Sequence, residues 1–287
     1  MDYLVVAPHT PFFQWQVALI IQSFRLQKIE ENLAVLLVAS EDKPIQSNFC
    51  NHFVDHPRLR AIRLPCDSDP DIIRLHGIEH AVKTGFVNPT FASLPVYSVL
   101  RHPISSPIAQ ITFSYKPEFT FQHLESFGIS SRAISKRMMD KKQWIPVGDV
   151  LLFDKLTDDF YHLAKSRGEM IAFDSKRELL KENMTYFPRA IFRAAMSFAI
   201  METYGNLTLD TTRHLEAGMQ ENDSITPIIN YDYGSPPEFS RNFYKKETLP
   251  IQLSDNPFNG ILRTQETLTA VYMKMIVKSL ASDSENS

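Results

Sequence analysis

Short apolar runs alternate with amphipathic segments along the first half of the chain. Leu4 to Ala7 and Ala34 to Ala39 are uninterrupted apolar runs, which are typical of strands buried on both faces. Between them, Gln14 to Leu26 repeats its apolar residues at helical spacing. The alternation continues with strands predicted at Ala61 to Leu64, Val96 to Leu100 and Ile111 to Tyr115, and with a helix at Asp71 to Lys83. This order predicts an α/β fold with a mostly parallel sheet and helices on its faces.

The second half of the chain is richer in helical patterns. Predicted helices cover Glu118 to Phe127, Ser131 to Lys142, Thr157 to Ser166, Ser175 to Asn183, Phe187 to Tyr204 and Ile261 to Leu280, with one strand at Pro227 to Tyr231. No repeat, low-complexity tract or linker divides the sequence. We therefore expect one domain over residues 1–280, followed by a disordered polar tail at 281–287.

Composition narrows the class of protein. The chain has 287 residues, 44% of them hydrophobic, which is enough for one large α/β domain. A formal net charge of -3 excludes a uniformly basic nucleic-acid surface but allows a local basic groove. The two cysteines form no zinc spacing and no disulfide framework, which favours a reducing compartment. No apolar run reaches membrane length and no leader pattern precedes Tyr3, so we expect a cytoplasmic protein without a membrane partner.

The loop after the first predicted strand carries aromatic and amide side chains. Ligands bind at the carboxyl ends of the strands in an open parallel sheet, so the loops after Ala7, Ala39, Leu64 and Leu100 are candidate binding segments. In the first of them, Gln14 and Gln16 can bond a base or a ribose, and an aromatic ring can stack on a base. Alternatively, the aromatic residues of this loop pack the first helix onto the sheet.

Five short segments follow one another in a recognisable order. They are Pro11 to Gln16, Val96 to Ile108, Trp144 to Leu152, Ile228 to Gly234 and Arg241 to Lys246, the last followed by Leu249 and Pro250. This series resembles the hydroxyproline O-arabinosyltransferases over about residues 3 to 250. The resemblance implies a GT-A-like glycosyltransferase fold with a Rossmann-like sheet, and transfer of a pentose such as arabinose from a UDP-sugar donor to a hydroxyl.

The loop after the first predicted strand and the later segments that resemble the family together give a set of predicted donor-binding residues. They are Pro8, His9, Thr10, Phe13, Gln14, Gln16, Arg101, His102, Asn230, Arg241, Lys245 and Lys246.

The sequence departs from this family at the metal-binding positions. The family has an acidic Asp-x-His pair where this chain has Leu100-Arg101-His102, and a later histidine where this chain has Asn230. A leaving diphosphate needs positive charge, which a metal ion or an arginine can supply. We therefore predict a metal-independent enzyme in which Arg101 takes a catalytic role in place of the ion. A shifted register, or a non-catalytic binder of sugar nucleotides, would also explain these changes.

Two alternative metal sites remain open. Asp67 and Asp69 follow a predicted strand and could bind manganese or magnesium, or Asp69 could cap the next helix. His76, Glu79 and His80 match the H-x-x-E-H spacing of a zinc hydrolase, or they are ordinary residues of a partly exposed helix.

A carboxylate is needed to take the proton of the acceptor in an inverting transferase. Asp232 is our first choice because it follows the strand of Asn230, and Glu238 and Glu202 are the other candidates. Asp232 could equally cap the turn at Gly234.

The acceptor is expected to be cytoplasmic, and 5-hydroxymethylcytosine in bacteriophage DNA is one such alcohol. A DNA acceptor predicts a basic surface formed by Arg132, Lys136, Arg137, Lys141 and Lys142, although these residues also suit a solvated helix face. A protein hydroxyl of the hydroxyproline type is the alternative acceptor.

Overall fold

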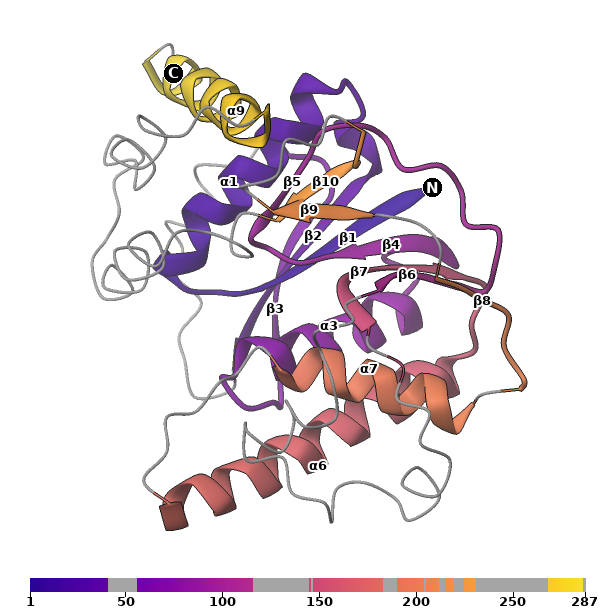
Figure 1. Ribbon diagram of the computed structural model, residues 1–287. Helices are drawn as coiled ribbons and strands as arrows, with labels where there is room; N and C mark the ends of the chain where they lie inside the picture. Colours follow the sequence, from indigo (N-terminus) through magenta and orange to yellow (C-terminus); the bar gives the residue numbers. More distant parts are fainter. Residues whose placement is uncertain are drawn as a thin grey trace.

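A seven-stranded sheet forms the centre of the computed structural model (Figure 1). The structure describes residues 1–40, 56–115, 145, 147–182, 190–203, 205–211, 215–218, 225–230 and 268–285. The strand order is β3-β2-β1-β4-β7-β6-β8. The strands are β1 (Asp2–Pro8), β2 (Leu33–Ser40), β3 (Leu59–Leu64), β4 (Thr90–Leu94), β6 (Ile111–Tyr115), β7 (Val147–Asp154) and β8 (Leu209–Asp210).

One strand of this sheet runs against the others. β3, β2, β1 and β4 are mutually parallel, and β6 pairs in parallel with β8. β7 pairs antiparallel with both β4 and β6. The first residues of β7 therefore lie at the edge of the sheet where the parallel strands end.

Helices cover both faces of the sheet. α1 (Pro11–Leu26) and α9 (Leu268–Glu285) lie on one face, and α3 (Pro70–Lys83), α6 (Asp158–Glu182) and α7 (Ala190–Glu202) lie on the other (Figure 1). A short 3-10 helix, Glu30–Asn32, leads into β2. In β1, Leu4 and Val6 pack toward α3, α6 and α7, whereas Tyr3, Val5 and Ala7 pack toward α1. Burial on both faces explains why this strand is apolar at every one of these positions.

A second, three-stranded sheet lies on the α1 side. It has the order β5-β10-β9, formed by β5 (Ser98–Leu100), β10 (Ile228–Asn230) and β9 (Glu216–Gly218). The hydroxyl of Tyr272 in α9 donates to the backbone oxygen of Leu100 at 2.7 Å and accepts from Gln27, the C-cap residue of α1, at 3.0 Å. The C-terminal helix thereby holds α1 and the small sheet together.

The predicted fold class is confirmed: the chain is α/β, with a mostly parallel sheet and helices on both faces. The predicted fourth strand, Val96 to Leu100, is wrong as a member of the main sheet, because its residues form β5 of the small sheet. The parallel strand at that place is β4, which the hydrophobic pattern did not indicate. β7 was likewise not predicted as a strand.

Several helix boundaries also differ from those predicted. Two helices were expected at 157–166 and 175–183, but α6 is one continuous helix of 25 residues. α9 begins at Leu268 and extends to Glu285, past the predicted end at Leu280. The division into a single domain and a terminal tail stays a prediction. The helices predicted at 118–127 and 131–142 lie outside the described residues.

None of the helices in the described part of the chain is both long and apolar enough to cross a membrane.

A glycine allows α3 to approach β1 closely. A Cβ atom added to Gly77 would lie 2.3 Å from Cγ1 of Val6, which no real structure tolerates without a shift. Both residues belong to buried elements, so the backbone of α3 has little room to move away.

We expect Gly77→Ala to destabilise the protein by about 1–3 kcal/mol, because the added methyl overpacks the contact with Val6. Denaturant unfolding measures the change. The matched control is the same substitution in a Val6→Ala background, where the space vacated by the valine accommodates the methyl. There Gly77→Ala should be neutral or stabilising, since alanine favours helix more than glycine does. Equal costs in both backgrounds would show that this contact is not the cause.

Candidate active site

Buried charged and polar side chains gather at the carboxyl edge of the main sheet. Asp149 of β7 is only 1% exposed and is the centre of this group. Because Leu151 pairs with Ser93 near the end of β4, Asp149 lies just beyond the last residues of that parallel strand. This is the edge where open α/β sheets bind their ligands.

Arg193 of α7 binds Asp149 through two donors. Its Nε donates to Oδ1 of Asp149 at 2.9 Å, and its Nη2 donates to Oδ2. Burial by itself would lower the pKa of Arg193, but the charge and hydrogen bonds of Asp149 raise this pKa well above the ordinary value. A forked pair of this kind fixes the guanidinium in position as well as neutralising the carboxylate.

Arg74 of α3 is a second buried arginine at the same place. Its Nη2 donates to the hydroxyl of Ser93 at 3.0 Å and to the backbone oxygen of Asp149 at 2.6 Å. The guanidinium carbon lies 3.7 Å from the centre of the Phe192 ring. Burial lowers the pKa of Arg74, although the neighbouring acidic groups act in the opposite direction. Among the described residues, its Nε has no hydrogen-bond partner.

The small sheet supplies two more members of the cluster, Glu216 and Asn230. The Asn230 amide donates to Oε2 of Glu216 at 3.3 Å and to Oδ2 of Asp149 at 3.5 Å. The backbone N–H of Asp149 donates to Oε1 of Glu216 at 3.4 Å. Gly148 leaves room for this carboxylate, since a Cβ there would lie 2.6 Å from Oε1. β9 and β10 are thus joined to the start of β7 through polar side chains.

Asp71 ties α3 to the start of α7. Its Oδ2 accepts the backbone N–H of Phe192 at 2.8 Å, in the first turn of that helix. Burial raises the pKa of Asp71 to about 8, and the charges of Asp69 and Asp149 act in the same direction. At neutral pH this carboxyl is therefore mostly protonated, so the carboxylates of the cluster are those of Asp149 and Glu216.

The loop after β1 lies at the same edge of the sheet. Several of the residues predicted to bind the UDP-sugar donor belong to this loop. His9 is buried, donates its backbone N–H to Val38 at 2.8 Å, and has its pKa lowered by burial. Phe13 packs against the apolar core between α1 and the sheet, which is the packing role considered as the alternative. Gln16 is only 1% exposed. Pro8 ends β1 and Thr10 precedes α1, while the side chain of Gln14 lies outside the described residues.

Arg101 and His102 were also predicted to bind the UDP-sugar donor. They directly follow β5 of the small sheet and do not follow a strand of the main sheet. Both backbone N–H groups donate to the oxygen of Pro227, at 2.7 and 3.3 Å. Arg101 is 6% exposed and directly follows Leu100, whose backbone oxygen accepts from Tyr272 of α9. Asn230 is the predicted residue that belongs to the polar cluster. Arg241, Lys245 and Lys246 lie outside the described residues.

Of the three candidate catalytic bases, one lies within the described residues and two lie outside them. Asp232 and Glu238 lie outside the described residues. Glu202 accepts from Arg167 at 2.7 Å near the end of α7. Arg193 and Glu202 are separated by about 13 Å along the helix axis, so Glu202 is remote from the polar cluster.

Asp69 takes the structural role considered for it. Its carboxylate accepts the backbone N–H groups of Asp71 at 2.9 Å and of Ile72 at 3.3 Å, which caps α3. Asp67 in turn accepts the N–H of Asp69 at 3.2 Å. In the described ranges, no three His, Cys, Asp or Glu side chains are grouped so that they could hold a metal ion.

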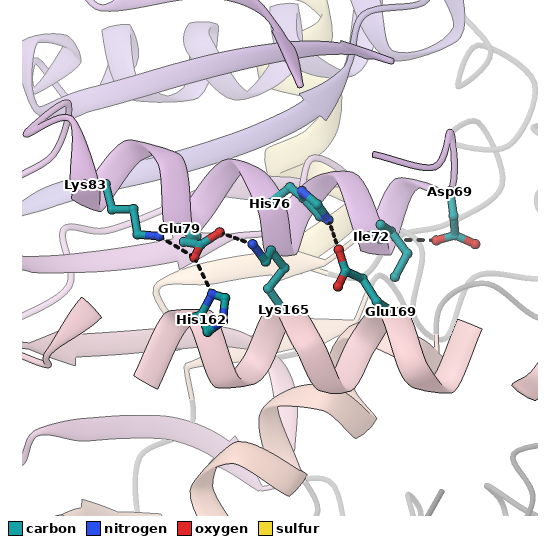
Figure 2. A network of polar contacts seen from close by, with 8 residues as sticks. All are labelled: Asp69, Ile72, His76, Glu79, Lys83, His162, Lys165 and Glu169. Carbon is teal, nitrogen blue, oxygen red and sulfur yellow. Dashed lines mark hydrogen bonds and ion pairs between the residues drawn. The ribbon is translucent and has the colours of Figure 1, made fainter. Parts of the chain in front are cut away.

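His76 and Glu79, two of the three residues of the H-x-x-E-H pattern, connect α3 to α6 (Figure 2). Glu79 is bound by Lys83 at 2.7 Å, Lys165 at 2.7 Å and His162 at 3.0 Å. These hydrogen bonds outweigh burial and lower the pKa of Glu79 to about 2. His76 contacts Glu169 of α6 at 2.8 Å, and burial lowers the pKa of His80. The structure thus gives Glu79 and His76 a role in helix packing.

The sequence interpretation missed Arg74, Asp149, Arg193 and Glu216 as site residues. Arg193 stands inside the otherwise apolar helix Ala190–Glu202, and Asp149 inside the otherwise apolar strand start Val147 to Leu152. A charged residue is almost never fully buried unless it is paired, so a lone charge in such a run is the signal that would have found these two. Arg74 and Glu216 lie among other polar residues and give no such signal.

No protein-family model matches the chain, and no curated protein matches it. Among solved structures, the galactosyltransferase LgtC with donor and acceptor sugar analogues is similar, with a TM-score of 0.49 and 9% identity over 97% of this chain and 96% of that one. Mouse xyloside xylosyltransferase 1 has a TM-score of 0.42 and 9% identity over 82% and 98% of the chains. A glycosyltransferase involved in glycosylation of the major capsid of PBCV-1 has a TM-score of 0.42 and 8% identity over 85% and 100%. These likenesses are too distant to assign an activity.

The buried carboxyl of Asp71 should make the protein less stable as pH rises. Its pKa is raised from 3.8 to about 8, so the native state holds a proton that the unfolded chain releases above about pH 4. The free energy of unfolding should fall between about pH 4 and 8, by at most about 1.4 kcal/mol per pH unit. Asp71→Asn keeps an acceptor oxygen for Phe192 and should flatten this slope in urea unfolding.

Glu79→Gln is the control with the opposite sign. The pKa of Glu79 is lowered from 4.5 to about 2, so the stability it contributes is lost only as pH falls through that range. Glu79→Gln should leave the slope above about pH 5 unchanged. An unaltered slope in Asp71→Asn would assign the titration to another group.

Proposed function

We propose that the chain is a glycosyltransferase with a GT-A-like fold that transfers a sugar from a UDP-sugar donor to a hydroxyl acceptor. The proposal rests on two independent features. The first is the series of sequence segments that resembles the hydroxyproline O-arabinosyltransferases. The second is the buried cluster of Arg74, Asp149, Arg193, Glu216 and Asn230 at the ligand-binding edge of the sheet.

The polar cluster is the observation that carries the proposal. Its members come from α3, β7, α7, β9 and β10, which are far apart in sequence. Burying this many polar and charged groups away from water is costly for a fold that needs only a core. A donor that combines a diphosphate with a polyhydroxylated sugar gives such groups a function, because arginines bind phosphate oxygens and carboxylates accept from sugar hydroxyls.

The reaction breaks one bond and forms another. The bond between the anomeric carbon and the diphosphate oxygen breaks, and UDP leaves with its electron pair. The anomeric carbon forms a new bond to the acceptor oxygen, whose proton passes to a base. Cations near the diphosphate stabilise the charge that develops on it. Asp232 stays our candidate for the base in an inverting reaction, on the basis of its place after β10.

The sugar and the acceptor are proposed from the sequence resemblance. A pentose, arabinose above all, is the proposed sugar, and 5-hydroxymethylcytosine in DNA is the proposed acceptor, with a hydroxyproline-type protein hydroxyl as the alternative. The basic residues predicted to contact DNA, from Arg132 to Lys142, lie outside the described residues.

Calorimetry with UDP tests the donor class. We expect UDP to bind more tightly than UMP or ADP, because the cluster would contact the diphosphate and the loop after β1 would contact the base. The titration is performed both with manganese and without it, so that the result does not depend on metal. Absence of UDP binding in both conditions would refute the proposed function.

Release of UDP from different donors tests the sugar and the acceptor. UDP-arabinose is compared with UDP-xylose and UDP-glucose, with hydroxymethylated duplex DNA or a hydroxyproline peptide as acceptor. We expect turnover to be fastest with UDP-arabinose and to require the hydroxymethylated base. Unmodified duplex DNA of the same sequence is the control. Transfer to the peptide alone would replace the DNA acceptor by the protein one.

A further inference from the structure

The family that the sequence resembles holds a divalent metal on the donor diphosphate, and the described residues do not fit such an ion. The parallel strand β4 ends at Leu94 and is followed by Pro95, Val96 and Tyr97, none of which has a carboxylate or an imidazole. Hard divalent cations prefer carboxylate, carbonyl and water oxygens. The segment after β4 offers no such side chain.

The carboxylates near this strand are already bound within the protein. Both oxygens of Asp149 accept from the forked guanidinium of Arg193. Glu216 accepts from the amide of Asn230 and from the backbone of Asp149. A metal ion bound here would have to displace Arg193 from Asp149. The guanidinium groups of Arg74 and Arg193 already balance the charges of Asp149 and Glu216, so little net attraction is left for a divalent cation.

A donor of Arg74 is left for an anion at the same place, beside Arg193. Arg74 is 5% exposed, yet its Nε has no hydrogen-bond partner among the described residues. Buried donors in folded proteins are nearly always paired, so a donor of this kind indicates a group supplied by a ligand. The side chain of Arg193 is 15% exposed, whereas that of Asp149 is 2% exposed. The arginine, rather than the carboxylate, therefore faces the accessible side of the pair.

We propose that Arg74 and Arg193 form a fixed pair of cations that binds the donor diphosphate in place of a divalent metal, with Asp149 as the residue that positions Arg193. This inference rests on the proposed function. It assigns the role of the ion to two residues of the main cluster instead of Arg101, which follows the residue that Tyr272 of α9 binds. Both guanidinium groups are held before the donor arrives, Arg74 by Ser93 and the backbone of Asp149, and Arg193 by the side chain of Asp149. Little reorganisation is then needed when the diphosphate leaves.

Metal dependence of UDP binding in the wild-type protein is the first test. Affinity measured by calorimetry should be equal, within about twofold, in chelator and in manganese. An affinity at least about tenfold higher with manganese would overturn the inference while leaving the proposed function intact. Absence of binding in both conditions would instead refute the function.

Substitution of the arginines is the second test. Arg193→Gln is combined with Asp149→Asn so that no buried carboxylate loses its partner, and Arg74→Gln is made separately. Each should weaken UDP binding by about 10- to 100-fold, as expected for the loss of a charge-assisted contact. Binding of uridine, which has no phosphate, should stay unchanged in the same variants and would report a loss of fold if it fell. Manganese should not restore UDP binding.

Arg167→Gln is the matched control, because Arg167 is also ion-paired but binds Glu202 away from the cluster. It should leave UDP affinity at the wild-type value. Wild-type UDP affinity in both arginine variants of the cluster would overturn the inference. So would a recovery of their affinity on addition of manganese.

Discussion

A buried carboxylate needs a cation or hydrogen-bond donors beside it, and the elements around Asp149 supply them. An isolated charge in the protein interior is very unfavourable, and at 1% exposure Asp149 is stabilised by the direct contact with Arg193. Arg193 in turn fixes the start of α7, and Asp71 holds the same turn through the N–H of Phe192. Asn230 and Glu216 bring in the small sheet. The contacts between the helical layer, the main sheet and the small sheet thus converge on one side chain.

The hydrophobic pattern predicted the strands that are apolar throughout. β1 and β2 are buried on both faces, and their sequences contain little else. β4 was missed because Thr90 and Ser93 interrupt its apolar residues, and both hydroxyls are used in the interior: Ser93 accepts from Arg74, and Thr90 donates to Asp154. Buried hydroxyl residues of this kind break the apolar run that predicts a strand. The single helix α6 was divided for a similar reason, since its middle carries the charges that contact α3.

The candidate site was only partly predictable, because ligand-binding residues were expected in the loops and only packing residues in the helices and strands. The loops at the carboxyl ends of the strands lie at the same edge of the sheet as the polar cluster, and Asn230, which the resemblance suggested as a donor-binding residue, is a member of that cluster. Arg101 was assigned to that edge because Val96 to Leu100 was predicted as a strand of the main sheet. The strand that pairs in parallel with β1 is instead β4, which ends at Leu94. Arg74 and Arg193 lie inside helices that were expected to contribute only packing. Which helix faces which strand depends on tertiary packing, and the linear pattern does not contain it.

The late position of the small sheet has a consequence for the order of assembly during synthesis. The strands β1 to β4 and helix α3 lie within the first hundred residues, while Glu216 and Asn230 come more than a hundred residues later. A nascent chain of that length can contain the parallel half of the sheet, whereas Asp149 and Arg193 are not yet synthesised, and Glu216 and Asn230 follow after them. Tyr272 of α9, which binds Leu100, is synthesised later still. The residues of the parallel half of the sheet are therefore all synthesised before the set of residues that form the polar cluster is complete.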